Sequence, residues 1–275
     1  MTGRRGALVT GAGRGLGKGI AAMLASRGFR VMVTDLDGRS AATAAADIGQ
    51  GAISAELDVR DHEQVEHVRD FLIEQVDTLS VWVNNAGVLL TGPAWEQTPE
   101  QRRLHLDVNA LGTINGTVAA IAAMRERGGH IVNIASLAGI TPVPGEAIYA
   151  ASKHAVIGFS TSTASDLKLA GIDNVRISCL CPDGIWTPML YDKLADPQAA
   201  LSFSGRLLEP GEVVRAVGRA LDSPRPVTTL PAWRGAMARF GAAFPRLGTA
   251  ALPLLTAQGR RKQTAVLRAE RSTQR

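Results

Sequence analysis

A glycine-rich turn between a short apolar run and a helical pattern constrains the fold of this chain more than any other feature. Residues 6–10 read as a buried strand, glycines follow at positions 11, 13, 15 and 17, and residues 15–27 read as a helix. Strand, glycine turn and helix make a phosphate-binding loop, because glycines let the backbone approach the anion while the free N–H groups of the helix face it. The turn therefore predicts an α/β fold with a phosphate-bearing ligand.

Strand and helix patterns alternate along the rest of the chain. Strands are expected near residues 6–10, 30–34, 52–57, 79–84, 129–135, 174–181 and 226–230, and helices near 15–27, 39–47, 61–75, 99–125, 147–170 and 210–221. This alternation favours a Rossmann-type, doubly wound parallel sheet of about seven strands, with its ligand at the carboxyl ends of the strands. We expect one domain over residues 1–231, followed by a helical extension over residues 232–275.

An acid ends the second predicted strand. Asp35 lies eighteen residues after Gly17. By itself it would be read as a helix cap or a loop acid. After a glycine turn, an acid at this place is the expected partner of the two hydroxyl groups of an adenosine ribose.

A tyrosine and a lysine four residues apart add chemistry to this frame. Tyr149 and Lys153 fall in the predicted helix 147–170 and would share one face, with Cβ atoms roughly 5–6 Å apart. A neighbouring ammonium favours the phenolate, so it lowers the tyrosine pKa from its ordinary value near ~10. A tyrosine tuned in this way can exchange a proton with an alcohol or ketone. Ser136 lies thirteen positions before Tyr149.

Together these residues resemble the short-chain dehydrogenases/reductases, from about residue 6 to about residue 230. The matching motifs are Thr10–Gly17, Asp58-Val59, Asn84–Gly87, Asn109, Ser136, Tyr149 and Lys153, in the order and spacing of the family. One departure lies after the sixth strand, where the family usually has Pro-Gly and this chain has Pro182-Asp183-Gly184. Aspartate tolerates unusual backbone angles, so Asp183 is expected to allow the turn while adding a carboxylate near the nicotinamide end of the site.

The resemblance implies an NAD(H)-dependent oxidoreductase that interconverts a secondary alcohol and a ketone. Tyr149 would be the general acid/base, Lys153 would lower its pKa and hold the nicotinamide ribose, and Ser136 would bind the substrate oxygen. Asn109 would hold a water that links Lys153 to solvent. The cofactor-binding residues would be Gly11, Arg14, Gly15, Leu16, Gly17, Asp35, Asp58, Val59, Asn85, Ala86, Gly87, Tyr149, Lys153, Ile185 and Thr187. Asp58 and Val59 would frame the adenine, residues 85–87 would line the ribose, and Ile185 and Thr187 would bind the carboxamide.

Two rival interpretations stay open. An NADPH-dependent carbonyl reductase of the same fold could use Arg14 or Arg39 on a 2′-phosphate, but Asp35 would repel that phosphate and Leu36 is not basic. A non-catalytic dinucleotide-sensing protein could keep the fold and lose the chemistry. Such a protein would have no need of Asn109, Ser136, Tyr149 and Lys153 together.

The positive charge of the chain is concentrated at its C-terminal end. The net charge is +5, yet residues 232–275 contain nine lysines and arginines and one acid, which leaves residues 1–231 at −3. No groove-reading motif accompanies these basic residues, so a general nucleic-acid-binding class is excluded. Two cysteines, Cys179 and Cys181, are expected to be buried structural thiols, and no histidine spacing suggests a metal site. Without a secretory or membrane-spanning apolar run, a cytoplasmic location is expected.

The extension itself carries an amphipathic pattern. An apolar stripe recurs at helical spacing, formed by Trp233, Met237, Phe240 and Phe244, and Pro245 is expected to end that helix. A second segment should be interrupted at Pro253, and the last dozen residues are a candidate disordered segment. We expect the apolar stripe to pack on the body or on a neighbouring subunit and to help close the substrate side. A basic helix lying on an anionic membrane is the lesser alternative.

The sequence constrains the substrate and the oligomeric state less than it constrains the fold. The loop over residues 188–208 is rich in leucine, and with Trp186 it would form either an apolar lid over a lipophilic alcohol or a set of core contacts. Members of the family are commonly homodimers or homotetramers in which the helices near 99–125 and 147–170 pair across a two-fold axis. The resemblance implies the same for this chain.

Overall fold

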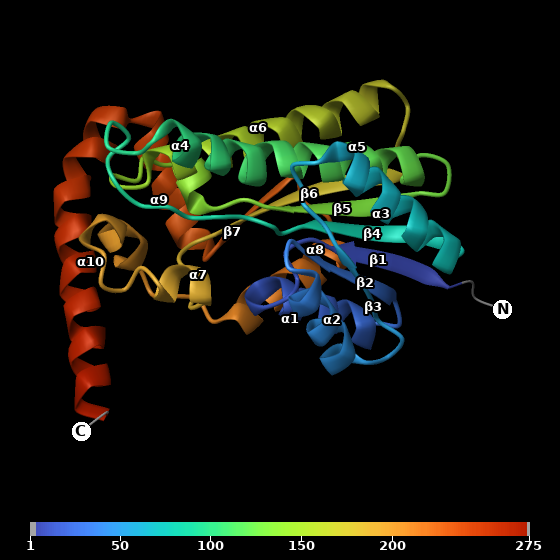
Figure 1. Cartoon of the computed structure of the whole chain (residues 1–275). Coiled ribbons are helices and arrows are strands. Elements are labelled where there is room, and N and C mark those ends of the chain that lie inside the picture. Colours follow the sequence, from blue (N-terminus) through green and yellow to red (C-terminus); the bar gives the residue numbers. More distant parts are fainter. Residues whose placement is uncertain (1–3, 274–275) are drawn as a thin grey trace.

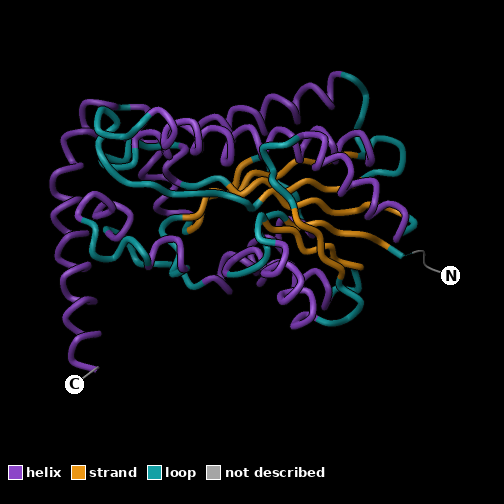
Figure 2. The backbone as a smooth tube through the Cα atoms, in the orientation of Figure 1, coloured by secondary structure: helices purple, strands orange, loops and turns teal. Residues whose placement is uncertain are grey.

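The computed structural model describes residues 4–273 and contains one seven-stranded parallel sheet with helices on both faces (Figures 1 and 2). The strands are β1 (Arg5–Val9), β2 (Arg30–Asp35), β3 (Ile53–Glu56), β4 (Thr78–Asn84), β5 (Gly129–Ile134), β6 (Val175–Pro182) and β7 (Val227–Leu230). Their order in the sheet is β3-β2-β1-β4-β5-β6-β7. The predicted Rossmann-type doubly wound sheet is therefore confirmed.

Two groups of helices sandwich the sheet (Figure 1). Helices α1 (Gly15–Ser26), α2 (Gly38–Ile48) and α8 (Pro210–Asp222) cover one face, and α3 (His62–Gln75), α5 (Gly112–Met124) and α6 (Ala147–Leu169) cover the other. Both faces of β1 and β2 are buried along most of their length, which is why their sequences are mostly apolar rather than alternating. Shorter elements are α4 (Pro99–His105), η2 (Leu137–Gly139), α7 (Pro188–Tyr191) and η3 (Pro197–Phe203).

The predicted helix over residues 99–125 has a more irregular course. Between α4 and α5 the chain makes a π-helical turn, η1 (Leu106–Leu111). Such turns insert an extra residue into a helix and are frequent at functional sites. A 3.6-residue hydrophobic pattern does not reveal them, so the sequence predicted one regular helix here.

The C-terminal extension forms two helices, α9 (Ala232–Ala243) and α10 (Pro245–Thr273). In Figure 1, α10 is the long red helix on the side of the molecule opposite the N-terminus. The expected interruption at Pro253 is wrong, since α10 runs through it. Pro253 is exposed, so water can bind the backbone carbonyl that loses its helical partner. Residues 264–273, expected as a candidate disordered segment, continue the helix.

The extension packs on the body, but not through the apolar stripe. Trp233, Met237, Phe240 and Phe244 remain 50–58% exposed. The buried residues of α9 are instead Gly235 and Ala238. A Cβ on Gly235 would lie 1.9 Å from Thr229 Oγ1, so only glycine lets α9 lie this close to β7. Small residues therefore make the contact, which a search for large apolar side chains overlooks.

Polar anchors hold α10 against η3. Lys262 Nζ donates to the carbonyl oxygens of Ser204 and Gly205 at 3.3 and 2.8 Å. Gln263, only 5% exposed, donates from Nε2 to the Asp196 carbonyl at 2.8 Å. Within residues 4–273, no helix combines the length and apolar character needed to cross a bilayer.

Candidate active site

A cavity of about 1110 Å³ opens at the carboxyl ends of the strands. It is lined by every residue predicted for the site except Asn109: Gly11, Arg14, Gly15, Leu16, Gly17, Asp35, Asp58, Val59, Asn85, Ala86, Gly87, Ser136, Tyr149, Lys153, Ile185 and Thr187. These residues come from six different strand ends and the helices that follow. Parallel strands place all their carboxyl ends on one edge, so distant motifs meet there.

The glycine turn has the geometry of an anion cradle. Gly11 and Gly15 have φ values of 60° and 59°, which L side chains rarely adopt. A Cβ on Gly17 would lie 2.3 Å from the Gly11 carbonyl oxygen, so the first turn of α1 packs directly on the loop. The first turn of α1 has no acidic residue, and Arg14 at its N-cap makes no side-chain cap. Its N–H groups can therefore bind a pyrophosphate.

The side chain of Asn85 braces this loop. Its side-chain Nδ2 donates to the carbonyl oxygens of Thr10 and Gly11, each at 3.0 Å. In return, the Thr10 hydroxyl accepts from the backbone N–H groups of Asn85 and Ala86 at 3.0 and 3.1 Å. The turn after β4 is thus tied to the turn after β1, and residues 85–87 reach the cavity with their backbone in a fixed position.

Asp35 is held at the end of β2 by backbone donors. Its Oδ2 accepts from Gly13 N at 3.0 Å and its Oδ1 from Asp37 N at 3.2 Å. The carboxylate is half-buried and lines the cavity on the same side as the glycine turn. It can accept hydrogen bonds from a ribose diol, and its charge opposes a phosphate in that place.

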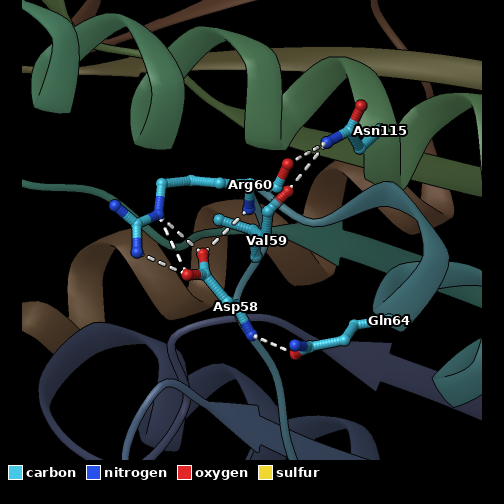
Figure 3. Close-up of polar contacts among 5 residues, drawn as sticks. All are labelled: Asp58, Val59, Arg60, Gln64 and Asn115. Carbon is cyan, nitrogen blue, oxygen red and sulfur yellow. Dashed lines mark hydrogen bonds and ion pairs between the residues drawn. The ribbon is translucent and has the colours of Figure 1, made fainter.

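The turn after β3 is stabilised by an ion pair that the sequence did not reveal (Figure 3). Arg60 Nε donates to both carboxylate oxygens of Asp58 at 2.9 and 3.0 Å. The hydrogen bonds from Arg60 hold the pKa of Asp58 below its ordinary value. Asn115 Nδ2 donates to the Val59 carbonyl at 2.9 Å, which ties the turn to α5. Asp58 is therefore engaged by Arg60, and Val59 presents its apolar surface to the cavity.

Ser136, Tyr149 and Lys153 lie together in the centre of the cavity. Ser136 follows β5, and its hydroxyl accepts from Ala138 N at 3.1 Å and hydrogen-bonds Tyr149. Lys153 is 5% exposed and donates from Nζ to the Ile134 carbonyl at 3.0 Å. Its Nζ lies 5.7 Å from the centroid of the Tyr149 ring. The predicted juxtaposition on α6 therefore exists.

The pKa of Tyr149 is shifted in the direction opposite to the one expected. Burial raises the pKa of its phenol above the ordinary value, Glu146 raises it further, and the hydrogen bond with Ser136 opposes both. Burial also lowers the pKa of Lys153 to about 8. The ammonium points at the Ile134 carbonyl rather than at the phenol oxygen, so desolvation outweighs its charge.

Asn109 lies behind the cavity wall. It is fully buried in η1, and its side chain exchanges two hydrogen bonds with the Val88 backbone and donates to Ser152 Oγ at 3.0 Å. A Cβ on Gly87 would lie 3.1 Å from Asn109 Oδ1 and 3.7 Å from Lys153 Nζ. A side chain at position 87 would therefore contact both Asn109 and Lys153.

Asp183 has a partner that explains its presence. Its Oδ2 accepts from Arg234 Nε at 2.7 Å, and both side chains are nearly buried. No unusual backbone angle is needed, because Gln50 is the one non-glycine residue with positive φ in the described chain. The carboxylate that replaces the usual glycine therefore pairs with α9 and fastens the extension beside the cavity.

Sequence reasoning missed two further groups near Tyr149. The imidazole of His105 is fully buried, accepts from Leu90 N at 2.9 Å, and makes an edge contact with the Tyr149 ring at 6.4 Å between centroids. Glu146 is 1% exposed and lines the cavity three residues before Tyr149. A lone histidine or glutamate carries no motif, although the three-residue spacing to Tyr149 was visible.

The far wall of the cavity is apolar. It is formed by the loop before α6, by part of the 188–208 loop, and by the extension: Val143, Met189, Leu190, Leu201, Met237, Phe240, Leu247, Leu252 and Leu255. Leu252 and Leu255 of α10 pack in one cluster with Tyr149. Trp186 does not line the cavity; it packs with Leu190, Leu194 and Phe203. The loop is thus part lid and part core, so each earlier alternative holds for some of its residues.

Comparison with known proteins agrees with this geometry. The family model described as short chain dehydrogenase matches residues 5–198. The 1-deoxy-11-beta-hydroxypentalenate dehydrogenase of Streptomyces exfoliatus is 35% identical over 228 residues, covering 80% of this chain and 81% of that protein. The 3-beta-hydroxysteroid dehydrogenase of Comamonas testosteroni is 31% identical over 221 residues, covering 77% and 86%. The structure of a short chain dehydrogenase/reductase from Burkholderia phymatum in complex with NAD superposes with a TM-score of 0.80 at 28% identity, covering 90% of this chain and 95% of that one.

The chain belongs to the short-chain dehydrogenase family of oxidoreductases. The recognition made from the glycine turn, Ser136, Tyr149 and Lys153 is confirmed.

Proposed function

We propose that the protein is an NAD(H)-dependent oxidoreductase that interconverts a lipophilic secondary alcohol and its ketone. The observation that carries this proposal is the meeting of Ser136, Tyr149 and Lys153 in one cavity with the glycine turn and Asp35. The relatives named above are a hydroxypentalenate dehydrogenase and a hydroxysteroid dehydrogenase, and the steroid in the second name supports an apolar substrate. So does the apolar far wall.

When bound, the nicotinamide supplies the hydride chemistry, and the protein supplies position and electrostatics. Ser136 binds the substrate oxygen next to the Tyr149 hydroxyl. In oxidation Tyr149 takes the alcohol proton, and in reduction it returns one to the ketone oxygen. The positive charge of Lys153 acts against the burial that disfavours a phenolate.

The cofactor groups would be held by the residues that line the cavity. The N-terminus of α1 with Gly11, Arg14, Gly15, Leu16 and Gly17 would bind the pyrophosphate, Asp35 the adenosine ribose, and Asp58 and Val59 the adenine. Lys153 would hold the nicotinamide ribose, with the backbone of residues 85–87 beside it. Ile185 and Thr187, which follow β6, would bind the carboxamide. Asn109 would act through a water between Lys153 and solvent.

Asp35 favours NAD over NADP. Its carboxylate lines the cavity, whereas Arg39 does not, and Arg60 is engaged by Asp58. The test is kcat/KM for both cofactors with one active alcohol. We expect a preference for NAD, and the ratio of the two kcat/KM values should fall in Asp35→Ala. The substitution removes the carboxylate that accepts hydrogen bonds from the ribose and repels a 2′-phosphate. Equal or better use of NADP by the wild-type protein would support the NADPH-dependent alternative.

A non-catalytic dinucleotide sensor is the alternative from another class. Cofactor reduction or oxidation with a panel of cyclic alcohols and ketones separates the two. A sensor would bind the dinucleotide, detected by fluorescence quenching, and turn over none of the panel.

We also propose a homodimer or homotetramer. Apolar side chains on the outer surface of η1 and α5 are strongly exposed: Leu106 43%, Leu111 42% and Val118 54%. Pairing of these helices with a second copy would bury them. Sedimentation equilibrium of the full chain measures the mass, and a monomer at micromolar concentration would contradict the proposal.

A further inference from the structure

The helix that carries Tyr149 presents a third polar side chain to the same cavity. Tyr149 and Lys153 share one face of α6, and Glu146 is the N-cap residue before the helix, three positions before Tyr149. All three line the cavity. Lys153 reaches toward β5, Tyr149 lies in the middle, and Glu146 stands at the start of the helix.

Glu146 does not serve the helix that it begins. It occupies the N-cap position of α6, where an acid commonly accepts a hydrogen bond from the first backbone N–H groups. Its side chain makes no such bond. Instead it turns toward η3, where the Ser202 hydroxyl donates to Oε1 at 2.6 Å.

The other carboxylates of the cavity are engaged elsewhere. Asp58 pairs with Arg60, Asp183 pairs with Arg234, and Asp35 accepts from Gly13 N and Asp37 N. Glu146 has no ion pair within the described residues, although it is 1% exposed. A buried carboxyl without a cation is costly, which is why burial raises its pKa to about 7. Asp196 raises this pKa further, and the apolar side chains of Val143 and Leu201 line the same cavity.

We propose that Glu146 is a specificity-determining residue that binds a second hydrogen-bond donor of the substrate, a hydroxyl or an amine, away from the carbon that reacts. This inference rests on the proposed function and narrows its substrate class to lipophilic alcohols with a second donor. A carboxylate has more acceptor sites than the one that Ser202 uses. A substrate donor would satisfy it, and an analogue that offers only an acceptor would leave it unpaired.

The kinetic test compares two substrates of similar shape. At about pH 9, above the pKa of Glu146, its carboxylate can only accept. 1,4-Cyclohexanediol offers a second donor, and 4-methoxycyclohexanol offers an acceptor in the same place. We expect the wild-type protein to favour the diol by about 10- to 100-fold in kcat/KM, the size of one hydrogen bond to a charged group. Most of the difference should lie in KM. Glu146→Leu should abolish or invert the preference, and Glu146→Gln, which keeps an acceptor, should retain part of it.

Ser202→Ala is the matched control for a purely structural clamp between α6 and η3. It removes the same hydrogen bond but leaves the carboxyl, so it should keep the preference for the diol. If Ser202→Ala and Glu146→Leu each lowered kcat/KM equally for the diol and the methoxy compound, Glu146 would be a structural clamp. The inference would then be overturned. An unchanged preference in Glu146→Leu would overturn it as well.

A binding measurement keeps the inference separate from turnover. In protein labelled with 13C at the glutamate carboxyls, the Glu146 resonance is the one missing from Glu146→Gln. With NAD present, the diol should shift this resonance and the methoxy compound should not. A wild-type protein that turns over no alcohol with either cofactor counts against the proposed function, whereas a resonance that ignores the diol counts against the role of Glu146.

Discussion

At the scale of single residues, burial opposes charge on Tyr149 and Lys153, the pair proposed to transfer the proton. It raises the pKa of Tyr149 and lowers the pKa of Lys153 to about 8. A protein accepts such desolvation where the groups are held for chemistry, and perturbed pKa values gather at functional sites for this reason. The packing of Tyr149 and Lys153 does not depend on a charge on either side chain.

Removal of the phenol hydroxyl should separate catalysis from cofactor binding. Tyr149→Phe keeps the ring and its contact with His105, and loses only the hydroxyl that is proposed to exchange the proton. We expect kcat to fall by about 10²–10⁴-fold while the Kd for NADH changes little. Lys153→Ala should lower kcat and also weaken NADH binding, since the lysine has two proposed roles. A near-normal rate for Tyr149→Phe at saturating cofactor would require another proton donor.

The buried carboxyl of Glu146 predicts a pH effect on stability. Its pKa rises from an ordinary 4.5 to about 7 on folding, so the unfolded chain loses this proton more easily. The contribution to stability is complete below pH 4.5 and is lost as the pH rises to about 7, in total about 3 kcal/mol. Glu146→Gln should therefore gain stability over the wild type across this window, measured by urea unfolding at several pH values.

His130 has the opposite effect on stability over nearly the same pH range. Burial lowers its pKa to about 4, so it destabilises the fold as the pH falls below 6.5. This histidine is present in both proteins, and the difference between Glu146→Gln and the wild type cancels it. A difference that stayed flat from pH 4.5 to 7 would show that Glu146 is not buried as the structure has it.

At the scale of elements, α5 lies unusually close to β4 because of a glycine. A Cβ on Gly116 would lie 2.1 Å from Asn84 Oδ1 and 2.8 Å from Trp82 Nε1. Asn84 is buried, and its amide accepts from Trp82 Nε1 and donates to Thr117 Oγ1 and Asn133 Oδ1. This network supports the end of β4, from which Asn85 braces the glycine turn.

Gly116→Ala should therefore destabilise the protein although alanine favours helices. The added methyl must push α5 away or break the Asn84 network, at a cost of about 1–3 kcal/mol. Gly211→Ala in α8 is a control, because the nearest atom to its Cβ is the flexible end of Arg215 at 3.4 Å. The free energy of unfolding of Gly211→Ala should stay within about 0.5 kcal/mol of the wild-type value. Equal unfolding free energies for the two variants would contradict this account.

At the scale of the whole molecule, the extension completes one wall of the cavity. Arg234 forms an ion pair with Asp183. Lys262 and Gln263 anchor α10 on η3, and Leu252 and Leu255 pack near Tyr149. The exposed apolar stripe of α9 adds Met237 and Phe240 to the open wall of the cavity. A lipophilic substrate would cover them.

Truncation tests this role. A chain that ends at Leu230 leaves the nearly buried Asp183 without its cation and opens the apolar wall. We expect a lower melting temperature and a larger loss of kcat/KM for bulky alcohols than for small ones. A chain that ends at Arg268 keeps Lys262 and Gln263 and should resemble the full protein.

The same truncation distinguishes packing from membrane binding. If the extension served only to bind anionic lipid, the shortened chain would keep its melting temperature and its activity. It would lose salt-sensitive binding to phosphatidylglycerol vesicles.

The sequence by itself determined the frame of this protein. Alternating patterns defined all seven strands, and the glycine turn, Asp35, Ser136, Tyr149 and Lys153 placed the site at one edge of the sheet. Such features can be predicted because they depend on local geometry: helical spacing, glycine conformations and the shared edge of parallel strand ends.

Only the tertiary structure decided which charges meet and which surfaces are covered. The pairs Asp183–Arg234 and Glu146–Ser202 join residues 51 and 56 positions apart, and no local pattern links them. The apolar stripe of α9 was expected to be the packing face, yet Gly235 and Ala238 make the contact, because close approach to β7 depends on small size rather than on hydrophobicity. The pKa of Tyr149 follows the same rule, since burial depends on everything packed around the phenol and not on the lysine four residues away.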